Sequence, residues 1–401
     1  MVHQDATRCL KCKNALCQKH CPINTDVPKI IELYNANEIE QAQKLLFANN
    51  PFSAVCSLVC DHQRQCFGNC VLNFKQVPIH FYEIEQELSL SYLKNVHFAS
   101  NTPTKQKIAI VGAGPAGISS AIWLSDEGYD VTLYEANAKI GGVLRYGIPD
   151  FRLSKDIVDQ YARILKEKGV HIRVNCHIGT SIGLAELASE HDAIILAVGT
   201  QQAKMMHIPN ETRYNVHYAI DYLKDPSSFE LGKKVIVLGG GNVAMDACRM
   251  AQKQGYDTYV YYRKTFEDMP ANKEEVDQAL AEGVKFKMFE VPIAIDDQGM
   301  IFAKGENVLD ERGRKQTKII PDTQHHVDCD SVIVAISQTL RLDFPQLKLN
   351  KWGFYETLSG HGCEDKKIFV CGDAYLGAKT VVEAVNDAKA TVKEVMEHLH
   401  G

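Results

Sequence analysis

Cysteine is concentrated at the start of this chain, where eight of its 13 cysteines lie within the first 70 residues. Clustered thiolates of this kind are typical ligands of soft metals. The first set has the spacing C-x2-C-x4-C-x3-C and is followed by Pro22, an ending typical of ferredoxin motifs. The sequence therefore predicts a pair of iron–sulfur clusters and a role in electron transfer. The two sets are Cys9, Cys12, Cys17 and Cys21, and Cys56, Cys60, Cys66 and Cys70.

Zinc and disulfides are the alternative uses of these cysteines. Zinc sites also take four thiolates, but they usually show two C-x2-C pairs, and only Cys9 and Cys12 have that spacing. Disulfides are typical of secreted chains, yet the first residues, MVHQDATRC, contain no apolar run resembling a signal peptide. Iron–sulfur ligation is favoured over both. We expect the scattered cysteines to be mainly buried, inert thiols; these are Cys176, Cys248, Cys329, Cys363 and Cys371.

A glycine-rich turn at residues 112–117 follows a predicted strand at 108–111. Its glycines form G-x-G-x-x-G, the pattern that places a dinucleotide pyrophosphate at the N-terminus of the next helix. A second predicted strand, 130–134, ends at Glu135, where a carboxylate can bind ribose hydroxyls. Since strand, glycines, helix, strand and acid occur in this order, the sequence predicts a dinucleotide site.

Two further features favour FAD in this first site. The pair Gly141-Gly142 follows soon after Glu135, as it commonly does in flavoproteins. Near the C-terminus, a strand is followed by Gly372-Asp373 and a long helix, the segment that contacts the ribityl chain in such flavoproteins. The N-terminus of that helix would stabilise the negative charge of a reduced flavin. The alternative is that Asp373 is merely a helix cap or a loop residue.

A second dinucleotide pattern occupies residues 233–264. Gly239, Gly241 and Ala244 form G-x-G-x-x-A, the alternative ending of the same fingerprint. Its second predicted strand, 258–262, is followed by Arg263 and Lys264 instead of an acid. Cations at this position can bind a 2′-phosphate, which favours NADP(H) over NAD(H). The alternative is that Arg263 only contacts solvent.

These motifs require an α/β fold with two Rossmann-like dinucleotide-binding domains, one inserted in the other, preceded by a helical domain that holds the clusters. Helices are expected in residues 28–50 and 82–96, and residues 99–107 read as a linker. The polar segment 296–328 gives no clear pattern. The predicted parts are a helical iron–sulfur domain (1–100), an FAD-binding domain (101–210 and 329–401) and an NAD(P)H-binding domain (211–328).

Composition sets limits on function. The 401 residues, 45% hydrophobic and 23% charged, are typical of a globular protein of two or three domains. A net charge of -6 gives no electrostatic footprint for nucleic acid, and no apolar stretch is long enough to predict a membrane span. Thiolate ligands need reducing conditions, so we expect a cytoplasmic protein.

The whole chain resembles the small subunit of glutamate synthase and its relatives, which include the NAD(P)H-oxidising half, or separate subunit, of dihydropyrimidine dehydrogenase. A flavin-bifurcating ferredoxin:NADP oxidoreductase subunit belongs to the same group. The resemblance extends over nearly all of the chain. The matching runs are RCLKCKNALCQKHCP (8–22), VCSLVCDHQRQCFGNC (55–70), VGAGPAG (111–117), GGVLRYGIPDFRL (141–153), GGGNVAMD (239–246), YRKTFEDMPA (262–271) and CGDA (371–374).

The resemblance implies that each [4Fe–4S] cluster takes ligands from both cysteine sets. Cys9, Cys12, Cys17 and Cys70 would bind one cluster. Cys21, Cys60 and Cys66 would bind the other, with Glu85, shortly after Pro78-Ile79, as its fourth ligand. Cys56 would then be a bystander or an alternative ligand, and the alternative for Glu85 is an ordinary exposed helix residue.

The resemblance also implies the residues that bind the two nucleotides. For FAD these are Gly112, Gly114, Pro115, Ala116, Gly117, Glu135, Gly142, Arg145, Gly372, Asp373 and Thr380. For NADPH or NADH they are Gly239, Gly240, Gly241, Asn242, Val243, Ala244, Arg263 and Lys264. The cofactors carry the redox chemistry, so no catalytic acid, base or nucleophile is expected.

The implied function is that of an NAD(P)H-oxidising FAD and iron–sulfur oxidoreductase that acts as an electron-input subunit. Its acceptor would be a large catalytic subunit, that of glutamate synthase in the leading hypothesis. The alternatives are the FMN-containing subunit of dihydropyrimidine dehydrogenase, or ferredoxin as a diffusible carrier. A non-enzymatic redox sensor with degenerate sites is a further alternative, and the intact glycines, acids and thiolates argue against it.

Overall fold

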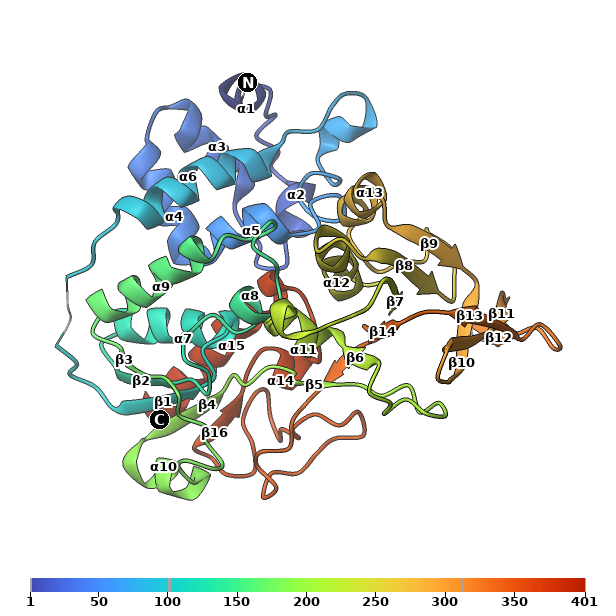
Figure 1. Ribbon diagram of the computed structural model, residues 1–401. Coiled ribbons are helices and arrows are strands. Elements are labelled where there is room, and N and C mark those ends of the chain that lie inside the picture. The colour runs from blue at the N-terminus through green and yellow to red at the C-terminus, as the bar shows by residue number, and fades with distance from the viewer. Residues whose placement is uncertain (1, 100–101, 312, 401) are drawn as a thin grey trace. The chain divides into compact units, whose positions relative to one another are not determined.

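The computed structural model describes residues 2–99, 102–311 and 313–400 (Figure 1). The chain forms two compact units. Unit 1 contains the residues up to 145, residues 150–201 and the residues from 339 onward, and unit 2 contains residues 146–149 and 202–338. The predicted boundary at 100/101, and part of the predicted linker 99–107, lie outside the described residues.

Unit 1 begins with a helical region, as the sequence predicts. Asp26 caps α3, since its carboxylate accepts the Lys29 N–H at 3.2 Å, and Pro28 occupies the first turn. The expected helix at 82–96 is α6. The elements are α1 (Val2–Thr7), α2 (Leu16–Lys19), α3 (Val27–Asn35), α4 (Ile39–Asn49), α5 (Ser53–Val59), the 3-10 helix η1 (Val71–Phe74) and α6 (Phe81–Asn95).

The rest of unit 1 is built on a parallel sheet in the order β16-β4-β1-β2-β3. Val111 is in register with Tyr134 and Leu196, and Leu196 with Val370, so the segments that follow these four strands meet at one sheet edge. The strands are β1 (Lys107–Val111), β2 (Asp130–Tyr134), β3 (His171–Arg173), β4 (Ala193–Leu196) and β16 (Ile368–Val370). The helices are α7 (Pro115–Asp126), α8 (Val143–Tyr146), α9 (Lys155–Glu167), α10 (Leu184–Glu190), α14 (Asp373–Leu376) and α15 (Val381–His400).

Residues 48–51 connect the helical region to the rest of unit 1 through hydrogen bonds. The Trp123 indole of α7 donates to the Ala48 carbonyl at 3.1 Å, and the Tyr161 hydroxyl of α9 donates to the Pro51 carbonyl at 2.9 Å. The Lys389 ammonium of α15 donates to Asn49 Oδ1 at 2.8 Å. Three helices from different parts of the sequence therefore bind one short stretch.

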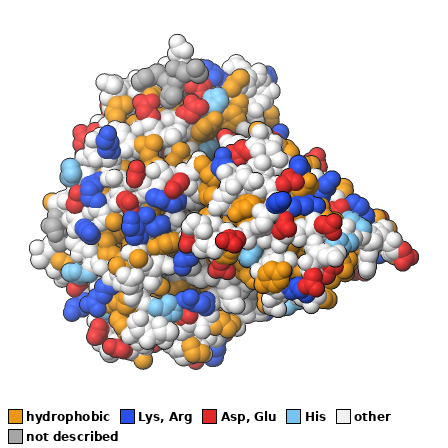
Figure 2. All heavy atoms as spheres, in the orientation of Figure 1, with side chains coloured by type: hydrophobic (Ala, Val, Ile, Leu, Met, Phe, Trp, Pro, Cys, Tyr) orange, Lys and Arg blue, Asp and Glu red, His pale blue; other side chains and the backbone are white. Residues whose placement is uncertain are grey.

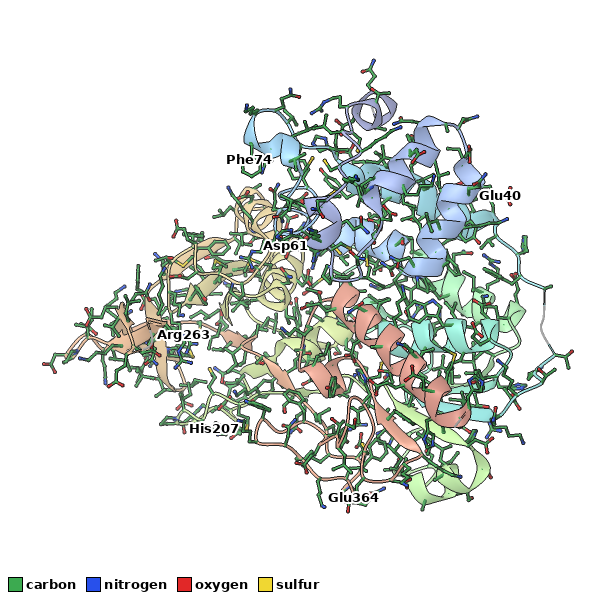
Figure 3. All side chains as sticks on the ribbon, turned by 180° about the vertical axis from the view of Figure 1, so that it is seen from behind. Glu40, Asp61, Phe74, His207, Arg263 and Glu364 are labelled. Carbon is green, nitrogen blue, oxygen red and sulfur yellow. The ribbon has the colours of Figure 1, made fainter. Side chains whose placement is uncertain are left out.

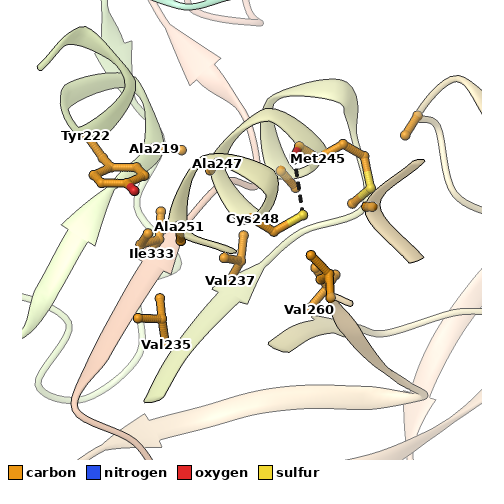
Figure 4. Packing of buried hydrophobic residues seen from close by; sticks show 14 of the residues in the cluster. Ala219, Tyr222, Val235, Val237, Met245, Ala247, Cys248, Ala251, Val260 and Ile333 are labelled. Atoms are coloured by element: carbon orange, nitrogen blue, oxygen red, sulfur yellow. Dashed lines mark hydrogen bonds between the residues drawn. The ribbon is translucent and has the colours of Figure 1, made fainter. Parts of the chain in front are cut away.

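Unit 2 contains a second parallel sheet, in the order β6-β14-β7-β8-β9. A buried cluster packs α12 against this sheet, with the Cys248 thiol donating to the Met245 carbonyl at 3.2 Å (Figure 4). The strands are β6 (Val216–Tyr218), β7 (Lys234–Leu238), β8 (Asp257–Tyr262), β9 (Lys285–Met288) and β14 (Ser331–Val334). The helices are α11 (Ala219–Lys224), the 3-10 helix η2 (Pro226–Ser228), α12 (Asn242–Lys253) and α13 (Lys273–Ala281).

The polar segment before residue 328 is an antiparallel sheet, which its sequence pattern does not reveal. In it β11 (Gly299–Leu309) pairs with β10 (Glu290–Ile295), β12 (Lys315–Ile319) and β13 (His325–Asp328). Residues 331–334, expected in the second flavin segment, instead form β14 beside β7, because their continuous apolar run is buried in the second sheet. The short strands β5 (Gln202–Ala203) and β15 (Gln338–Thr339) lie where the chain passes between the units.

The visible face of the molecule carries basic and acidic side chains interspersed among apolar ones (Figure 2). In the parts of the chain that the structure describes, no helix is long and apolar enough to cross a membrane. Four of the scattered cysteines are buried as expected, whereas Cys176 is only half-buried.

Candidate functional site

The first glycine turn leaves bare backbone at the carboxyl end of β1. Gly112 has φ 101°, and a Cβ on Gly117 would lie 1.9 Å from the Gly112 carbonyl oxygen. A Cβ on Gly142 would lie 2.7 Å from the Gly114 Cα. Gly112, Gly117 and Gly142 therefore do not accept a side chain, and α7 begins at Pro115. Such a turn can accept a pyrophosphate against its backbone N–H groups.

Glu135 is held beside this turn. Its buried carboxylate accepts the Ala113 N–H at 3.0 Å and the Asn137 N–H at 2.8 Å. Register between β1 and β2 brings the acid to the glycines, as the sequence predicts. Arg145, in contrast, donates through Nε to the Ile140 carbonyl at 2.7 Å and pairs with Asp159.

The Gly372-Asp373 segment follows β16 at the same sheet edge. Gly372 has φ 66° and donates its N–H to Asp387 at 2.6 Å. Burial raises the pKa of Asp373 to about 7, and the Lys379 N–H donates to its carboxylate at 3.2 Å. Asp373 is the first residue of the short helix α14, and it does not cap the long helix α15.

Thr380 caps the long helix α15. Its N–H donates to the Glu383 carboxylate at 3.0 Å, while its hydroxyl accepts the Glu383 N–H at 3.4 Å. This reciprocal pair is a capping box, and T-x-x-E is a sequence signal that could have located the helix start.

Asp387 is a residue that the sequence does not single out. It accepts the Gly372 N–H through one oxygen and contacts His361 Nε2 at 3.0 Å through the other. Glu394 lies 2.8 Å from His361 Nδ1. Burial lowers the pKa of His361, but the two carboxylates outweigh it and raise the pKa above its usual value. These partners are too distant in sequence for a motif to reveal them.

Four thiols form a first group in the helical region: Cys9, Cys12, Cys17 and Cys70. Burial is the main reason that the pKa of Cys17 is raised to about 12, and the nearby thiolates of Cys70, Cys9 and Cys12 raise it further. The same causes raise the pKa of Cys9. The group is the one that the resemblance implies, and it joins the two cysteine sets across about 50 residues of sequence.

A second group surrounds a small cavity. Cys21, Cys56, Cys60, Cys66 and Glu85 line it. Glu85 is only 6% exposed, so it is not the surface helix residue of the alternative interpretation. Burial raises its pKa well above the usual range. Such a carboxyl must lose its proton to bind a metal, as thiols must.

Cys56 belongs to this second group. Asn50 Nδ2 donates to its sulfur at 3.3 Å, and the Cys60 thiol also donates to it, which lowers the pKa of Cys56. The cavity therefore offers two candidates, Glu85 and Cys56, for a fourth ligand. Within the described ranges, no three His, Cys, Asp or Glu side chains gather as the ligands of a single metal ion.

The donor set of both groups fits iron–sulfur clusters, which take thiolates and tolerate one harder ligand. Burial raises the pKa of Cys66, and the charges of Glu85, Cys21 and Cys17 raise it further. Since Cys17 belongs to the first group, the two groups are near enough to interact electrostatically. Val382, in the first turn of α15, also lines the cavity. The cavity therefore adjoins the helix that follows Gly372-Asp373.

The second glycine turn lies in unit 2. Gly239 has φ 144°, and a Cβ on Gly240 would lie 2.6 Å from the Tyr262 ring, so neither position accepts a side chain. Pro270 lies next to Gly241, and α12 begins at Asn242 with Val243 and Ala244 in its first turn. Arg263, labelled in Figure 3, is exposed directly after β8, and Lys264 is half-buried.

Known protein families match both parts of the chain. Residues 106–388, and in a second match 83–191, fit the pyridine nucleotide-disulphide oxidoreductase family. Residues 1–95 fit the 4Fe-4S domain II of dihydropyrimidine dehydrogenase. The glutamate synthase [NADPH] small chain of Azospirillum brasilense is 30% identical over 97% of this chain and 87% of that relative.

This chain belongs to the glutamate synthase small-chain family. A second relative in that family, the NAD-dependent dihydropyrimidine dehydrogenase subunit PreT of Salmonella typhimurium, is 29% identical over 99% of this chain and 94% of its own. Mycobacterium tuberculosis FprA, solved with NADPH, shares the fold, with a TM-score of 0.66 and 19% identity over 74% of this chain and 85% of its own. The family member described here is an NAD(P)H-dependent FAD and iron–sulfur oxidoreductase.

Proposed function

We propose that this protein is the electron-input subunit of a larger enzyme, taking electrons from NAD(P)H and delivering them one at a time to a partner. The observation that carries the proposal is the cavity of the second thiol group, which Val382 lines two residues after the Thr380 cap. The segment expected to hold the flavin and the thiols expected to hold a cluster thus belong to adjoining parts of unit 1.

Bound FAD would supply the exchange between an electron pair and single electrons. We propose that the turn Gly112–Gly117, with Gly142, binds its pyrophosphate and that Glu135 binds its ribose. Asp373 and the N-terminus of α15 would contact the flavin end, where the helix dipole stabilises negative charge. Arg145 would fix the turn around Gly141 and Gly142, since its guanidinium already donates to the Ile140 carbonyl and pairs with Asp159.

For the clusters we propose the first thiol group as one complete ligand set. Cys21, Cys60, Cys66 and Glu85 would form the other, with Cys56 in reserve as an alternative fourth ligand. A carboxylate is harder and more negative than a thiolate, so it would lower the potential of the cluster that it binds. Because thiolate ligands persist under reducing conditions, we also infer a cytoplasmic location.

The large subunit of glutamate synthase is the proposed partner, since the relative from Azospirillum brasilense is named for that enzyme. An FMN-containing dihydropyrimidine dehydrogenase subunit is the second candidate, which the match of residues 1–95 favours. Ferredoxin would serve if neither large subunit binds.

An anaerobic titration of the purified protein tests the proposal. We expect stoichiometric FAD, about eight irons per chain, and bleaching of flavin and cluster absorbance by NADPH. Mixing with each large subunit then asks which complex turns over its own substrate. Zinc in place of iron, or no bleaching by either NADPH or NADH, would contradict the electron-input function.

A further inference from the structure

The loop after β8 is folded onto the second glycine turn. The Tyr262 hydroxyl donates to the Asp268 carbonyl at 2.9 Å, and the Ala271 N–H donates to the Gly240 carbonyl at 3.0 Å. The Asn272 N–H donates to Asn242 Oδ1 at 2.8 Å. Residues 263–272 therefore form one wall of the nucleotide site, with Arg263 and Lys264 at its start.

The β11–β12 hairpin binds the outside of this loop. The Thr317 hydroxyl donates to the Arg263 carbonyl at 3.4 Å, and Lys264 Nζ donates to the Lys315 carbonyl at 3.2 Å. Lys315 Nζ in turn lies 2.8 Å from the Asp268 carboxylate. Lys315 and Thr317 are two residues apart in β12, so their side chains lie on the same face of the strand. That face is turned to residues 263–268.

Asp268 places a negative charge in the wall where a 2′-phosphate is expected. Its carboxylate accepts from the Thr265 hydroxyl at 2.9 Å, from Asn307 Nδ2 at 3.1 Å and from Lys315. Lys315 and Thr265 lower the pKa of Asp268 to about 2, so the group is ionised at neutral pH. Glu267 is a second acid close to Lys315.

An uncompensated carboxylate beside Arg263 and Lys264 would repel a phosphate and weaken the electrostatic attraction that both cations exert on it. Lys315 is the cation that offsets Asp268. Because Lys315 lies on the hairpin, 47 residues further along the chain, its contribution depends on the antiparallel sheet that the sequence pattern does not reveal.

We propose that Lys315 sets the preference of this protein for NADPH over NADH, by neutralising Asp268 so that Arg263 and Lys264 present net positive charge to the 2′-phosphate. Lys315 is then a specificity-determining residue outside the dinucleotide motif. NADH has no phosphate at this place, so its binding should not depend on the pair.

The test is a calorimetric titration of the oxidised, FAD-loaded protein with NADP⁺ and with NAD⁺, which needs neither turnover nor a partner subunit. Its outcome is thus independent of the electron-input function. Lys315→Met should weaken NADP⁺ binding about tenfold and leave NAD⁺ binding within about twofold. Asp268→Asn should tighten NADP⁺ binding, and the double variant should bind NADP⁺ about as well as the parent.

Two further variants control for fold and for general charge. Lys315→Arg keeps the charge and should retain NADP⁺ affinity. Lys318→Met removes an exposed lysine of the same strand from its opposite face and should change neither affinity. Three results would each overturn the proposal: equal loss of NADP⁺ and NAD⁺ binding in Lys315→Met, a double variant as weak as that single variant, or a parent that binds NAD⁺ more tightly.

Discussion

The polar residues of the candidate cofactor sites are more deeply buried in unit 1 than in unit 2. In unit 1, Glu135, Glu85 and Asp387 are each less than 10% exposed and already hold backbone or side-chain partners. In unit 2, Arg263 is exposed directly after its strand. A resident cofactor suits a buried, preorganised set of partners, whereas a nucleotide that must leave after each turnover suits cations open to solvent. We therefore expect the same strand–turn–helix scaffold to support permanent binding in unit 1 and exchangeable binding in unit 2.

The most severe test of this difference is to place a side chain in one of the two glycine turns. Gly117→Val should abolish FAD binding, since its Cβ alone would lie 1.9 Å from the Gly112 carbonyl oxygen. Gly239→Val should instead remove NADP⁺ binding and leave FAD in place, because Gly239 belongs to unit 2. FAD per chain and NADP⁺ titration measure both. Gly183→Ala, at a glycine with open space around it, serves as the control.

Removing the buried carboxylate ligand in unit 1 should prevent one of the two iron–sulfur clusters from binding. Glu85→Ala is expected to lower the iron content from about eight to about four per chain, because the second thiol group then lacks its carboxylate. Cys56→Ser should keep all of the iron. Iron assay and electron paramagnetic resonance of the reduced protein check this. The reverse pattern would make Cys56, and not Glu85, the fourth ligand.

Reversing the exposed charge in unit 2 should have a smaller, selective effect. Arg263→Glu is expected to weaken NADPH binding about 30- to 100-fold, through a lost phosphate contact and new repulsion. NADH binding and FAD content should stay nearly unchanged. The ratio of kcat/KM for the two nucleotides, measured with a small-molecule acceptor, gives the result. Equal loss with both nucleotides would indicate damage to the fold.

The smallest expected effect is a change in pH dependence. The carboxylates of Asp387 and Glu394 raise the pKa of His361 above its unfolded value, so protonated His361 stabilises the fold. This contribution is fully present below about pH 6.5 and is lost as pH rises through the folded pKa. His361→Asn should remove that part of the pH dependence of the free energy of unfolding, with FAD release as a second measurement. A variant with an unchanged pH profile would contradict it.

Much of the site was predictable because its parts are adjacent in sequence. Each glycine turn, the strand before it and the charged residue after the second strand lie within about 30 residues, and the register of β1 with β2 follows from the parallel pairing. Glu85 also carried a local signal, since it shares the buried face of α6 with Phe81, Ile84 and Leu88. An acid on an apolar helix face is unusual enough to indicate function.

What the sequence could not supply were contacts between distant segments. Asp387 and His361 are 26 residues apart, and Lys315 and Asp268 are 47 apart, so no short pattern contains either pair. The antiparallel sheet around β11 was missed because β12 and β13 are polar and largely exposed, and β11 itself changes from a mostly buried first half to a mostly exposed second half. Their stability depends on cross-strand pairing, which single-strand periodicity does not report.

The bonds that α7, α9 and α15 make to residues 48–51 have a mechanical consequence. With the helical region fixed at three points, the spacing between a flavin and the second thiol group would be set by the fold and not by diffusion of a hinged domain. Electron passage inside unit 1 should then be insensitive to solvent viscosity. Glycerol or sucrose would slow only those steps in which a nucleotide or a partner protein must arrive or leave.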